Sequence, residues 1–356
     1  MAPASSDAKS SRMTYRFLGN SGLLVSKLSL GSWMDVNDKH TADSWYEMMK
    51  LAFENGVNFF DNAEAYGGGL AERNMGAAIR KGITEGTWSR EDLVITTKIF
   101  FGAQDFMAKA GPNAQGLSRK HIIEGTKAAL KRLDQEYVDV LLCHRPEPLT
   151  PIEETVRAMN YVIDQGWAFY WGTSMWTAAQ ISEACEIADR LGLVRPIVEQ
   201  SIYSILDRNK VEFEYVDLYK KYKLGLTTWS PLAYGALTGK YSTGTPEGSR
   251  MENPMYKAIS PEFAARVEKA DKLKPVAQKL GVSLAELALA WCVSNENVST
   301  VMIGAKTPAQ LEQNLKAMAA VEKITPEVKA EIDALIPFVP ELSKFDGLTL
   351  LRSQHL

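Results

Sequence analysis

The hydrophobic positions along the chain fall into short continuous runs, which are separated by longer segments with helical spacing. Runs bounded by turn residues are typical of strands buried on both faces of a sheet. Ser118, placed just before the apolar pattern of "HIIEGTKAALKRL", is a helix start signal. The pattern predicts strands over 28–32, 57–61, 93–98, 138–144, 168–174, 197–201, 224–230 and 298–305, and helices over 41–55, 70–81, 118–134, 152–165, 177–191, 211–222, 261–280, 283–294 and 308–319.

Eight strand–helix units in succession, with no linker between them, predict a (β/α)8 TIM barrel, an α/β fold with a core of about 250 residues. We expect a single domain over 13–335, which begins with a β-hairpin that caps the barrel and turns at Asn20-Ser21-Gly22. The alternative is a doubly wound sheet, which would normally carry a GxGxxG turn after its first strand; none is present there. Residues 1–12 have the composition of a disordered tail, and 336–356 are expected to form a C-terminal tail.

Composition excludes several classes of protein. A chain that is 46% hydrophobic and 23% charged, with a net charge of −3, is typical of a globular protein and lacks a basic footprint for nucleic acid or anionic membranes. No apolar run approaches the ~20 residues that span a bilayer, and the start of the chain has no apolar signal segment. Three cysteines without close spacing favour a reducing compartment, the cytoplasm. Four histidines without HxxxH or CxxC argue against a metal site.

Polar residues lie at the ends of three neighbouring predicted strands. Asp61 ends the second strand and Tyr66 follows shortly after it, while Lys98 ends the third strand and His144 the fourth. A single polar residue at a strand end is ordinary. Because the carboxyl ends of barrel strands meet on one face, however, these four side chains are expected to converge there.

The four side chains make chemical sense as an acid catalyst. A free phenol with a pKa near 10 is a weak proton donor at neutral pH. An ammonium group about 4 Å away could lower the pKa of Tyr66 by up to ~3 units, and the Asp61 carboxylate would keep Lys98 protonated despite burial. His144 would donate a hydrogen bond to a substrate oxygen. The four residues therefore predict carbonyl reduction with Tyr66 as the general acid, which requires a source of hydride.

The three glycines Gly67-Gly68-Gly69 suggest either a phosphate-binding loop or a flexible strand-to-helix turn. The GxGxxG pattern fails, because Glu72 occupies its last glycine position and a carboxylate there would repel phosphate. We therefore interpret these glycines as a turn.

Better phosphate sites follow the seventh and eighth strands, where barrel enzymes often bind phosphate. "SPLAYGALTGK" supplies Lys240, and "GAKTPAQLEQN" places Lys306 just before a helix whose N-terminus favours an anion. Lys306, Arg250 and Gln310 together could bind a 2′-phosphate, which favours NADPH over NADH; the alternative is a solvated basic surface.

Several aromatic residues are candidates for the site. Tyr203, after the sixth strand, could stack on a nicotinamide or be an ordinary partly buried aromatic. An apolar mouth, suited to apolar carbonyls, would be lined by Trp33, Trp88, Phe100, Phe101 and Trp176, although packing of the barrel could also explain these.

Seven segments are together similar to the aldo-keto reductase superfamily, over about residues 14–320: "FDNAEAYGGGLAERNMGAAI", "LVITTKI", "VDVLLCHRP", "WGTSMW", "EQSIYS", "TTWSPLAYGALTGKY" and "IGAKTPAQLEQN". The resemblance implies a catalytic tetrad of Asp61, Tyr66, Lys98 and His144, and a nicotinamide bound without a Rossmann domain. Ser174 and Gln200 would hold the carboxamide of the nicotinamide. The rest of the cofactor cleft would be formed by Ser32, Trp33, Asp61, Trp229, Ser230, Pro231, Leu232, Ala233, Tyr234, Lys240, Arg250, Gly304, Lys306, Gln310, Gln313 and Asn314.

Within this superfamily, "GSW", "YWGTSMW" and "WSPLAYGALTGKYSTG" are most similar to the β subunits of voltage-gated potassium channels and their relatives. This branch implies a tetramer and an alternative function, that of a redox-sensing subunit which binds NADPH and docks to a potassium channel α subunit. His144 stands where the animal channel subunits carry asparagine, and the N-terminal segment lacks a long basic inactivation stretch; both features favour an enzyme. Met175 replaces an arginine beside Ser174, so one cofactor contact would be lost.

Overall fold

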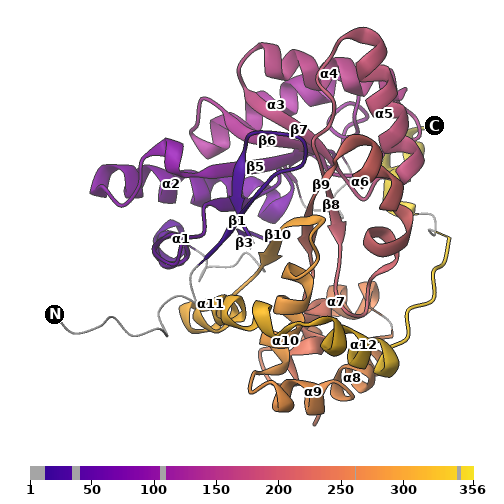
Figure 1. Ribbon diagram of the computed structural model, residues 1–356. Coiled ribbons are helices and arrows are strands. Elements are labelled where there is room, and N and C mark those ends of the chain that lie inside the picture. The colour runs from indigo at the N-terminus through magenta and orange to yellow at the C-terminus, as the bar shows by residue number, and fades with distance from the viewer. Residues whose placement is uncertain (1–12, 34–40, 105–109, 261, 343–345) are drawn as a thin grey trace.

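A computed structural model describes residues 13–33, 41–104, 110–260, 262–342 and 346–356 (Figure 1). Eight parallel strands close into a barrel in the order β10-β3-β4-β5-β6-β7-β8-β9. Closure confirms the predicted (β/α)8 fold and excludes the doubly wound alternative. The strands are β3 (Leu28–Gly31), β4 (Phe59–Asp61), β5 (Val94–Ile99), β6 (Val138–Cys143), β7 (Ala168–Ser174), β8 (Val198–Ile202), β9 (Gly225–Trp229) and β10 (Val298–Ile303).

Helices surround the barrel close to the predicted positions. The start signal at Ser118 is confirmed, since its side chain accepts a hydrogen bond from the His121 amide at the beginning of α3. The described helices are α1 (Ala42–Glu54), α2 (Leu70–Glu85), α3 (Arg119–Leu133), α4 (Ile152–Asp164), α5 (Ala178–Leu191), α6 (Val216–Tyr222), α7 (Pro254–Ile259), α8 (Phe263–Asp271), α9 (Lys274–Lys279), α10 (Leu284–Val293), α11 (Pro308–Leu315) and α12 (Pro326–Leu335).

Three predicted helices differ from the structure. The segment predicted over 261–280 is two helices, because Pro275 lies in the first turn of α9, where its missing amide is tolerated, and would break a continuous helix. The segment over 211–222 begins as a π-helical turn, Lys210–Glu214, before α6. The segment over 308–319 changes after α11 into a 3-10 helix, Lys316–Lys323. α7 and α12 lie in regions where no helix was predicted.

The predicted N-terminal hairpin is present and closes the amino end of the barrel. Its strands, β1 (Tyr15–Phe17) and β2 (Leu24–Ser26), pair in an antiparallel register. Leu18 and Val25 of this hairpin pack in one cluster with Phe59, Val94, Val140, Leu142, Ile197 and Val198. The reactive face of the barrel must therefore be the opposite, carboxyl end.

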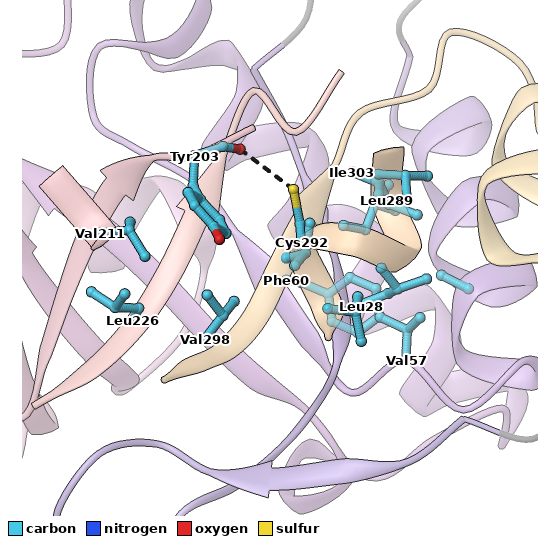
Figure 2. Packing of buried hydrophobic residues seen from close by; sticks show 14 of the residues in the cluster. Leu28, Val57, Phe60, Tyr203, Val211, Leu226, Leu289, Cys292, Val298 and Ile303 are labelled. Carbon is cyan, nitrogen blue, oxygen red and sulfur yellow. Dashed lines mark hydrogen bonds between the residues drawn. The ribbon is translucent and has the colours of Figure 1, made fainter. Parts of the chain in front are cut away.

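A second, larger cluster lies between the strands and the helices. Phe60 belongs to it together with Leu289 and Cys292 of α10, as Figure 2 shows. Since side chains alternate along a strand, Phe59 points into the barrel, Phe60 points outward and Asp61 points inward again at the barrel mouth.

The predicted C-terminal tail is partly structured. After α12 the chain runs along the right-hand side of the molecule, yellow in Figure 1, and its last described residues form a 3-10 helix over Gly347–His355. Arg352 of this helix donates a 2.9 Å hydrogen bond to Glu147, in the loop after β6. The segment therefore docks near the carboxyl end of the barrel. The predicted tail over 1–12 lies outside the described residues.

Among the helices that the structure describes, none alone is long and apolar enough to cross a membrane. Only Phe263–Lys279 together with Leu284–Val293 reaches that length and composition, as a pair bent by 88°.

Candidate active site

The structure brings the four predicted catalytic residues together around the ammonium group of Lys98. Its Nζ donates hydrogen bonds to Asp61 Oδ2 at 2.5 Å, to the Asn62 carbonyl at 2.7 Å and to the Tyr66 hydroxyl at 3.0 Å. The Tyr66 and His144 rings meet edge to face with their centroids 5.7 Å apart. All four residues are buried.

The barrel itself sets this geometry. Asp61 and Lys98 come from the neighbouring strands β4 and β5, and His144 directly follows β6. The backbone amide of His144 donates to the Ile99 carbonyl at 3.1 Å, which extends the ladder between β5 and β6. Asp61 Oδ1 accepts hydrogen bonds from Thr96 at 2.7 Å and from the Gln200 amide at 3.0 Å, so its orientation is fixed from two sides.

Burial changes one electrostatic prediction. Burial raises the pKa of Tyr66 above its usual value. Lys98 lowers this pKa, as predicted, but burial outweighs it, so the net shift is opposite to the expected lowering. Burial also disfavours the charged form of Lys98, but Asp61 and Tyr66 together raise its pKa, as predicted for the carboxylate. Burial, assisted by the charges of Lys98 and Arg145, holds the pKa of His144 well below its usual range, so this imidazole is neutral near pH 7.

Two aromatic side chains border the acid group. The Trp33 ring packs edge to face on Tyr66 with centroids 4.9 Å apart, and the Phe101 ring lies 5.0 Å from His144. Phe100 packs behind Phe101 at 4.9 Å. Trp176, just after β7, is buried and has an indole nitrogen without a hydrogen-bond partner in the described structure.

Trp88 does not lie at the mouth. It precedes β5, at the amino end of the barrel, and its indole donates to the Ile79 carbonyl while its ring packs against Tyr46 and Phe53. The prediction that Trp88 lines the site is wrong, because a residue before a strand lies on the face opposite to the site.

The glycine segment after Tyr66 is a tight turn. Gly69 has a positive φ of 88°, and a Cβ there would lie 2.7 Å from Cδ of Arg132. Arg132 in turn donates to the buried carboxylate of Glu72 at 2.6 Å. Glu72 therefore anchors α2 to α3 through this ion pair, and it also accepts a hydrogen bond from Thr97 of β5.

Ser174, the last residue of β7, lies beside Gln200 of β8, with which it is paired in the strand register. The Ser174 hydroxyl donates to the Gln200 carbonyl at 3.0 Å. Met175 has a positive φ of 60°, unusual for this residue, and its amide donates to Glu199 at 2.5 Å. Glu199 is fully buried, and burial raises its pKa to about 7.

The loop after β9 has an unusual backbone. Ser230, Ala233 and Tyr234 all have positive φ, at 55°, 50° and 57°, and such strain in a non-glycine residue persists where the surrounding structure enforces it. Pro231 and Ala233 are buried, Leu232 and Trp229 are partly exposed, and Lys240 is exposed. The Arg250 guanidinium lies over the Tyr256 ring at 4.9 Å.

Several residues predicted for the cofactor cleft lie at or beside the N-terminus of α11. The Thr307 side chain caps this helix, and the Gln310 side chain accepts a 2.8 Å hydrogen bond from the Lys306 amide. Asn314 donates to the Gly304 carbonyl at 3.5 Å, while Lys306 and Gln313 are exposed. Because β10 pairs with both β9 and β3, this helix start, the β9 loop and Ser32 border one part of the mouth.

These residues fit a dinucleotide. The buried hydroxyl of Ser32 and the indole of Trp176 are polar groups without partners in the described structure, as expected of groups that meet a ligand. No group of three or more His, Cys, Asp or Glu that could hold a metal ion occurs in the described ranges.

Tyr203 takes a different position from the one predicted. Figure 2 shows it beside Cys292, whose thiol donates to the Tyr203 carbonyl. Its ring packs on Trp291 of α10 at 5.0 Å, and its hydroxyl donates to Glu212 at 2.7 Å. Tyr203, Glu212 and Trp291 line a cavity of about 570 Å³ on the flank of the barrel, between α6, α10 and α12. The stacking prediction for Tyr203 is wrong, because its ring faces the helical layer.

Two features of the site were not predicted from the sequence. Glu64 accepts hydrogen bonds from the amides of Phe100 and Gly102, at 2.7 and 2.8 Å, and so fixes the loop that carries Phe101. Arg145 follows His144 directly and donates to its carbonyl oxygen at 2.7 Å. Its position right after a catalytic candidate was the only signal available.

The chain matches one family of oxidoreductases. The family model "Aldo/keto reductase family" matches residues 27–337, so the chain belongs to the aldo/keto reductase family. Its relatives include proteins named "Probable voltage-gated potassium channel subunit beta" from Arabidopsis thaliana, 52% identical, and from Oryza sativa subsp. japonica, 50% identical. Each of these alignments covers 92% of this chain and 98% of the relative.

Proposed function

We propose that this protein is an NADPH-dependent reductase that converts aldehydes or ketones to alcohols. The observation that carries the proposal is the contact of one ammonium group with both a phenol and a carboxylate. Lys98 Nζ lies 3.0 Å from the Tyr66 hydroxyl and 2.5 Å from Asp61 Oδ2. A buried phenol held in this way can act as a proton donor.

In the proposed reaction, the carbonyl carbon receives hydride and the carbonyl oxygen receives the Tyr66 proton. When bound, NADPH supplies the hydride and leaves as NADP⁺. The Lys98 ammonium stabilises the phenolate that remains on Tyr66, and Asp61 keeps Lys98 charged. His144, neutral because its pKa is lowered by burial, donates a hydrogen bond that orients the substrate oxygen. Trp33 and Phe101 exclude water beside Tyr66 and His144.

The cofactor would lie across the mouth from Ser174 and Gln200 to α11. Ser174, Gln200 and Asp61 would hold the nicotinamide end, and Ser32, Trp33 and the loop Trp229–Tyr234 would border the middle. Lys240, Arg250, Lys306 and Gln310 would hold the phosphates, with Gly304, Gln313 and Asn314 beside the adenine end. The exposed Lys306 at a helix N-terminus supports NADPH over NADH.

The test mixes the protein with NADPH and 4-nitrobenzaldehyde and follows the loss of NADPH absorbance. We expect turnover by wild type and a loss of about 10²- to 10⁴-fold in kcat for Tyr66→Phe, the usual range for removal of a general acid. Tyr161→Phe, a tyrosine of α4 that packs on Trp167, is the matched control and is expected to keep wild-type activity. Equal rates for wild type and Tyr66→Phe would refute the proposal.

The names of the relatives favour a second function, that of a voltage-gated potassium channel β subunit. We propose, for this second function, a cytoplasmic subunit that binds NADPH and senses redox state. In this case the protein would be a tetramer and would purify with a potassium channel α subunit from mild detergent extracts. Light scattering tests the tetramer, and recovery of the channel tests the partner. Rapid turnover of aldehydes, together with no recovered channel, would refute the channel-subunit function and support the reductase.

A further inference from the structure

Arg145 places a guanidinium group beside the proposed reaction centre without a role in the proposed chemistry. The residue follows His144 directly, and its side chain is only 14% exposed. Its charge lies near enough to lower the pKa of the Tyr66 hydroxyl, the His144 imidazole and the Tyr234 hydroxyl, although burial dominates the pKa of all three. Arg145 therefore lies near both the Tyr66 hydroxyl and the loop after β9.

The hydrogen bonding of this guanidinium is incomplete. One terminal nitrogen donates to the His144 carbonyl at 2.7 Å. The buried Nε lies 3.2 Å from Asp346 Oδ2 but makes no hydrogen bond of good geometry in the described structure. A buried guanidinium normally uses its planar fork to bind a carboxylate through two parallel hydrogen bonds, so the contact with Asp346 leaves part of this capacity unused.

Asp346 belongs to the C-terminal segment, not to the barrel. It lies just before the 3-10 helix Gly347–His355, where its Oδ1 caps the Leu348 amide at 2.9 Å. Its carboxylate therefore has a second function in the cap and is 31% exposed. Because Asp346 is partly exposed, it can turn away from Arg145 into solvent without leaving a buried anion.

We propose that Arg145 is a specificity-determining residue which binds the carboxylate of an anionic carbonyl substrate, and that Asp346 occupies this position until the substrate displaces it. The proposal rests on the proposed function and narrows the substrate class to carbonyl compounds with a carboxylate on the side of the molecule away from the reacting carbon. Binding exchanges one carboxylate for another on the same guanidinium, and the carbonyl is then reduced by the hydride and proton already described.

The kinetic test compares 4-carboxybenzaldehyde with its neutral methyl ester, methyl 4-formylbenzoate, in the NADPH-loaded protein. We expect wild type to favour the acid and Arg145→Met to lose about 10- to 100-fold in kcat/KM for the acid, with little change for the ester, the range for one hydrogen-bonded charge contact. Asp346→Asn keeps a side-chain oxygen for the cap and is expected to lower KM for the acid alone. Arg157→Gln, at an exposed arginine of α4, is the control.

A binding test separates this proposal from the proposed function. Calorimetry on the NADP⁺-loaded protein compares 4-(hydroxymethyl)benzoate with the neutral 4-(hydroxymethyl)benzamide. Tighter binding of the benzoate that is lost in Arg145→Met supports the carboxylate site even if no aldehyde is reduced, which would refute the reductase alone. Equal losses for acid and ester, or equal binding of benzoate and benzamide by wild type, would overturn the carboxylate site. Weaker NADP⁺ binding by Arg145→Met would assign the residue to the cofactor and would overturn it as well.

Discussion

Lys98 and Asp61 form an ion pair at the centre of the site, with Nζ and Oδ2 2.5 Å apart and with the two side chains 0% and 3% exposed. Taking two charges out of water costs several kcal/mol each, and their attraction offsets this cost only when both partners are present. The pair is therefore poor evidence for stability but good evidence for function, because it keeps a charged ammonium group beside the Tyr66 hydroxyl.

Asp61→Asn is expected to weaken both folding and catalysis. It leaves the Lys98 ammonium buried without its counter-ion, which typically costs about 3–5 kcal/mol in the free energy of unfolding. Lys98 would then lose its proton more readily, and kcat would fall. Urea unfolding and single-turnover kinetics measure the two effects. Asp43→Asn removes the exposed partner of Lys81 and should leave the unfolding midpoint unchanged; an unchanged midpoint for Asp61→Asn would mean that Lys98 is not charged in the folded protein.

The pH dependence of kcat/KM is expected to follow Tyr66 alone. Burial, partly opposed by Lys98, raises the pKa of Tyr66, so the proton donor stays protonated at neutral pH and activity falls only above about pH 10. Burial and neighbouring cations hold the pKa of His144 well below its usual value, so this residue stays neutral and adds no step near pH 6.5. Rates for wild type and His144→Asn between about pH 5.5 and 10.5 measure this; a step near pH 6.5 that disappears in His144→Asn would show that His144 titrates.

The positions of Asp61, Lys98 and His144 could be predicted because each follows a buried strand, and the barrel brings all strand ends to one face. The same rule explains the failure at Trp88, which precedes its strand. Tyr203 could not be placed, because the direction of a side chain one residue beyond a strand depends on how the chain leaves the barrel; here it turns toward Trp291. The direction of the net pKa shift of Tyr66 could not be predicted, because the cost of burial depends on the packing of Trp33 and its neighbours. This packing has no sequence signal.

The C-terminal segment shows a further limit of prediction. The pairing of Asp346 with Arg145 and of Arg352 with Glu147 joins residues about 200 positions apart in the sequence. Asp346 and Arg352 do not lie in an apolar-periodic segment. Nothing in the local pattern therefore indicates that the C-terminal segment docks beside the site.

Stability is expected to fall with rising pH because of Glu199. Burial raises its folded-state pKa to about 7, whereas the unfolded value is near 4.3. Between these values the folded protein binds more protons than the unfolded chain, so the free energy of unfolding decreases as pH rises, by roughly 4 kcal/mol in all. Urea unfolding of wild type and Glu199→Gln at about pH 5 and pH 8 measures the difference. The variant should lose less stability over this range; parallel losses would show that Glu199 is ionised throughout.

The role of the glycines after Tyr66 can be separated from phosphate binding by two alanine substitutions. Gly69 and Gly86 both have positive φ, 88° and 71°, at the two ends of α2. A Cβ at Gly86 meets nothing within 4 Å, whereas at Gly69 it lies 2.7 Å from Arg132. Gly86→Ala is therefore expected to cost about 1–2 kcal/mol of stability, from backbone strain alone.

Gly69→Ala carries the same strain and must also displace Arg132 from Glu72, so it should cost about 1–3 kcal/mol more. Affinity for NADPH, measured by fluorescence titration, should be the same for both variants and wild type, because the proposed phosphate site lies around α11 and the loop after β9. If Gly69→Ala weakened NADPH binding while its stability matched that of Gly86→Ala, the glycine turn would be a phosphate loop after all, and Glu72 would have to lie away from the phosphate. The ion pair of Glu72 with Arg132, 2.6 Å long and buried, neutralises the carboxylate in the structure and ties the turn to α3 instead.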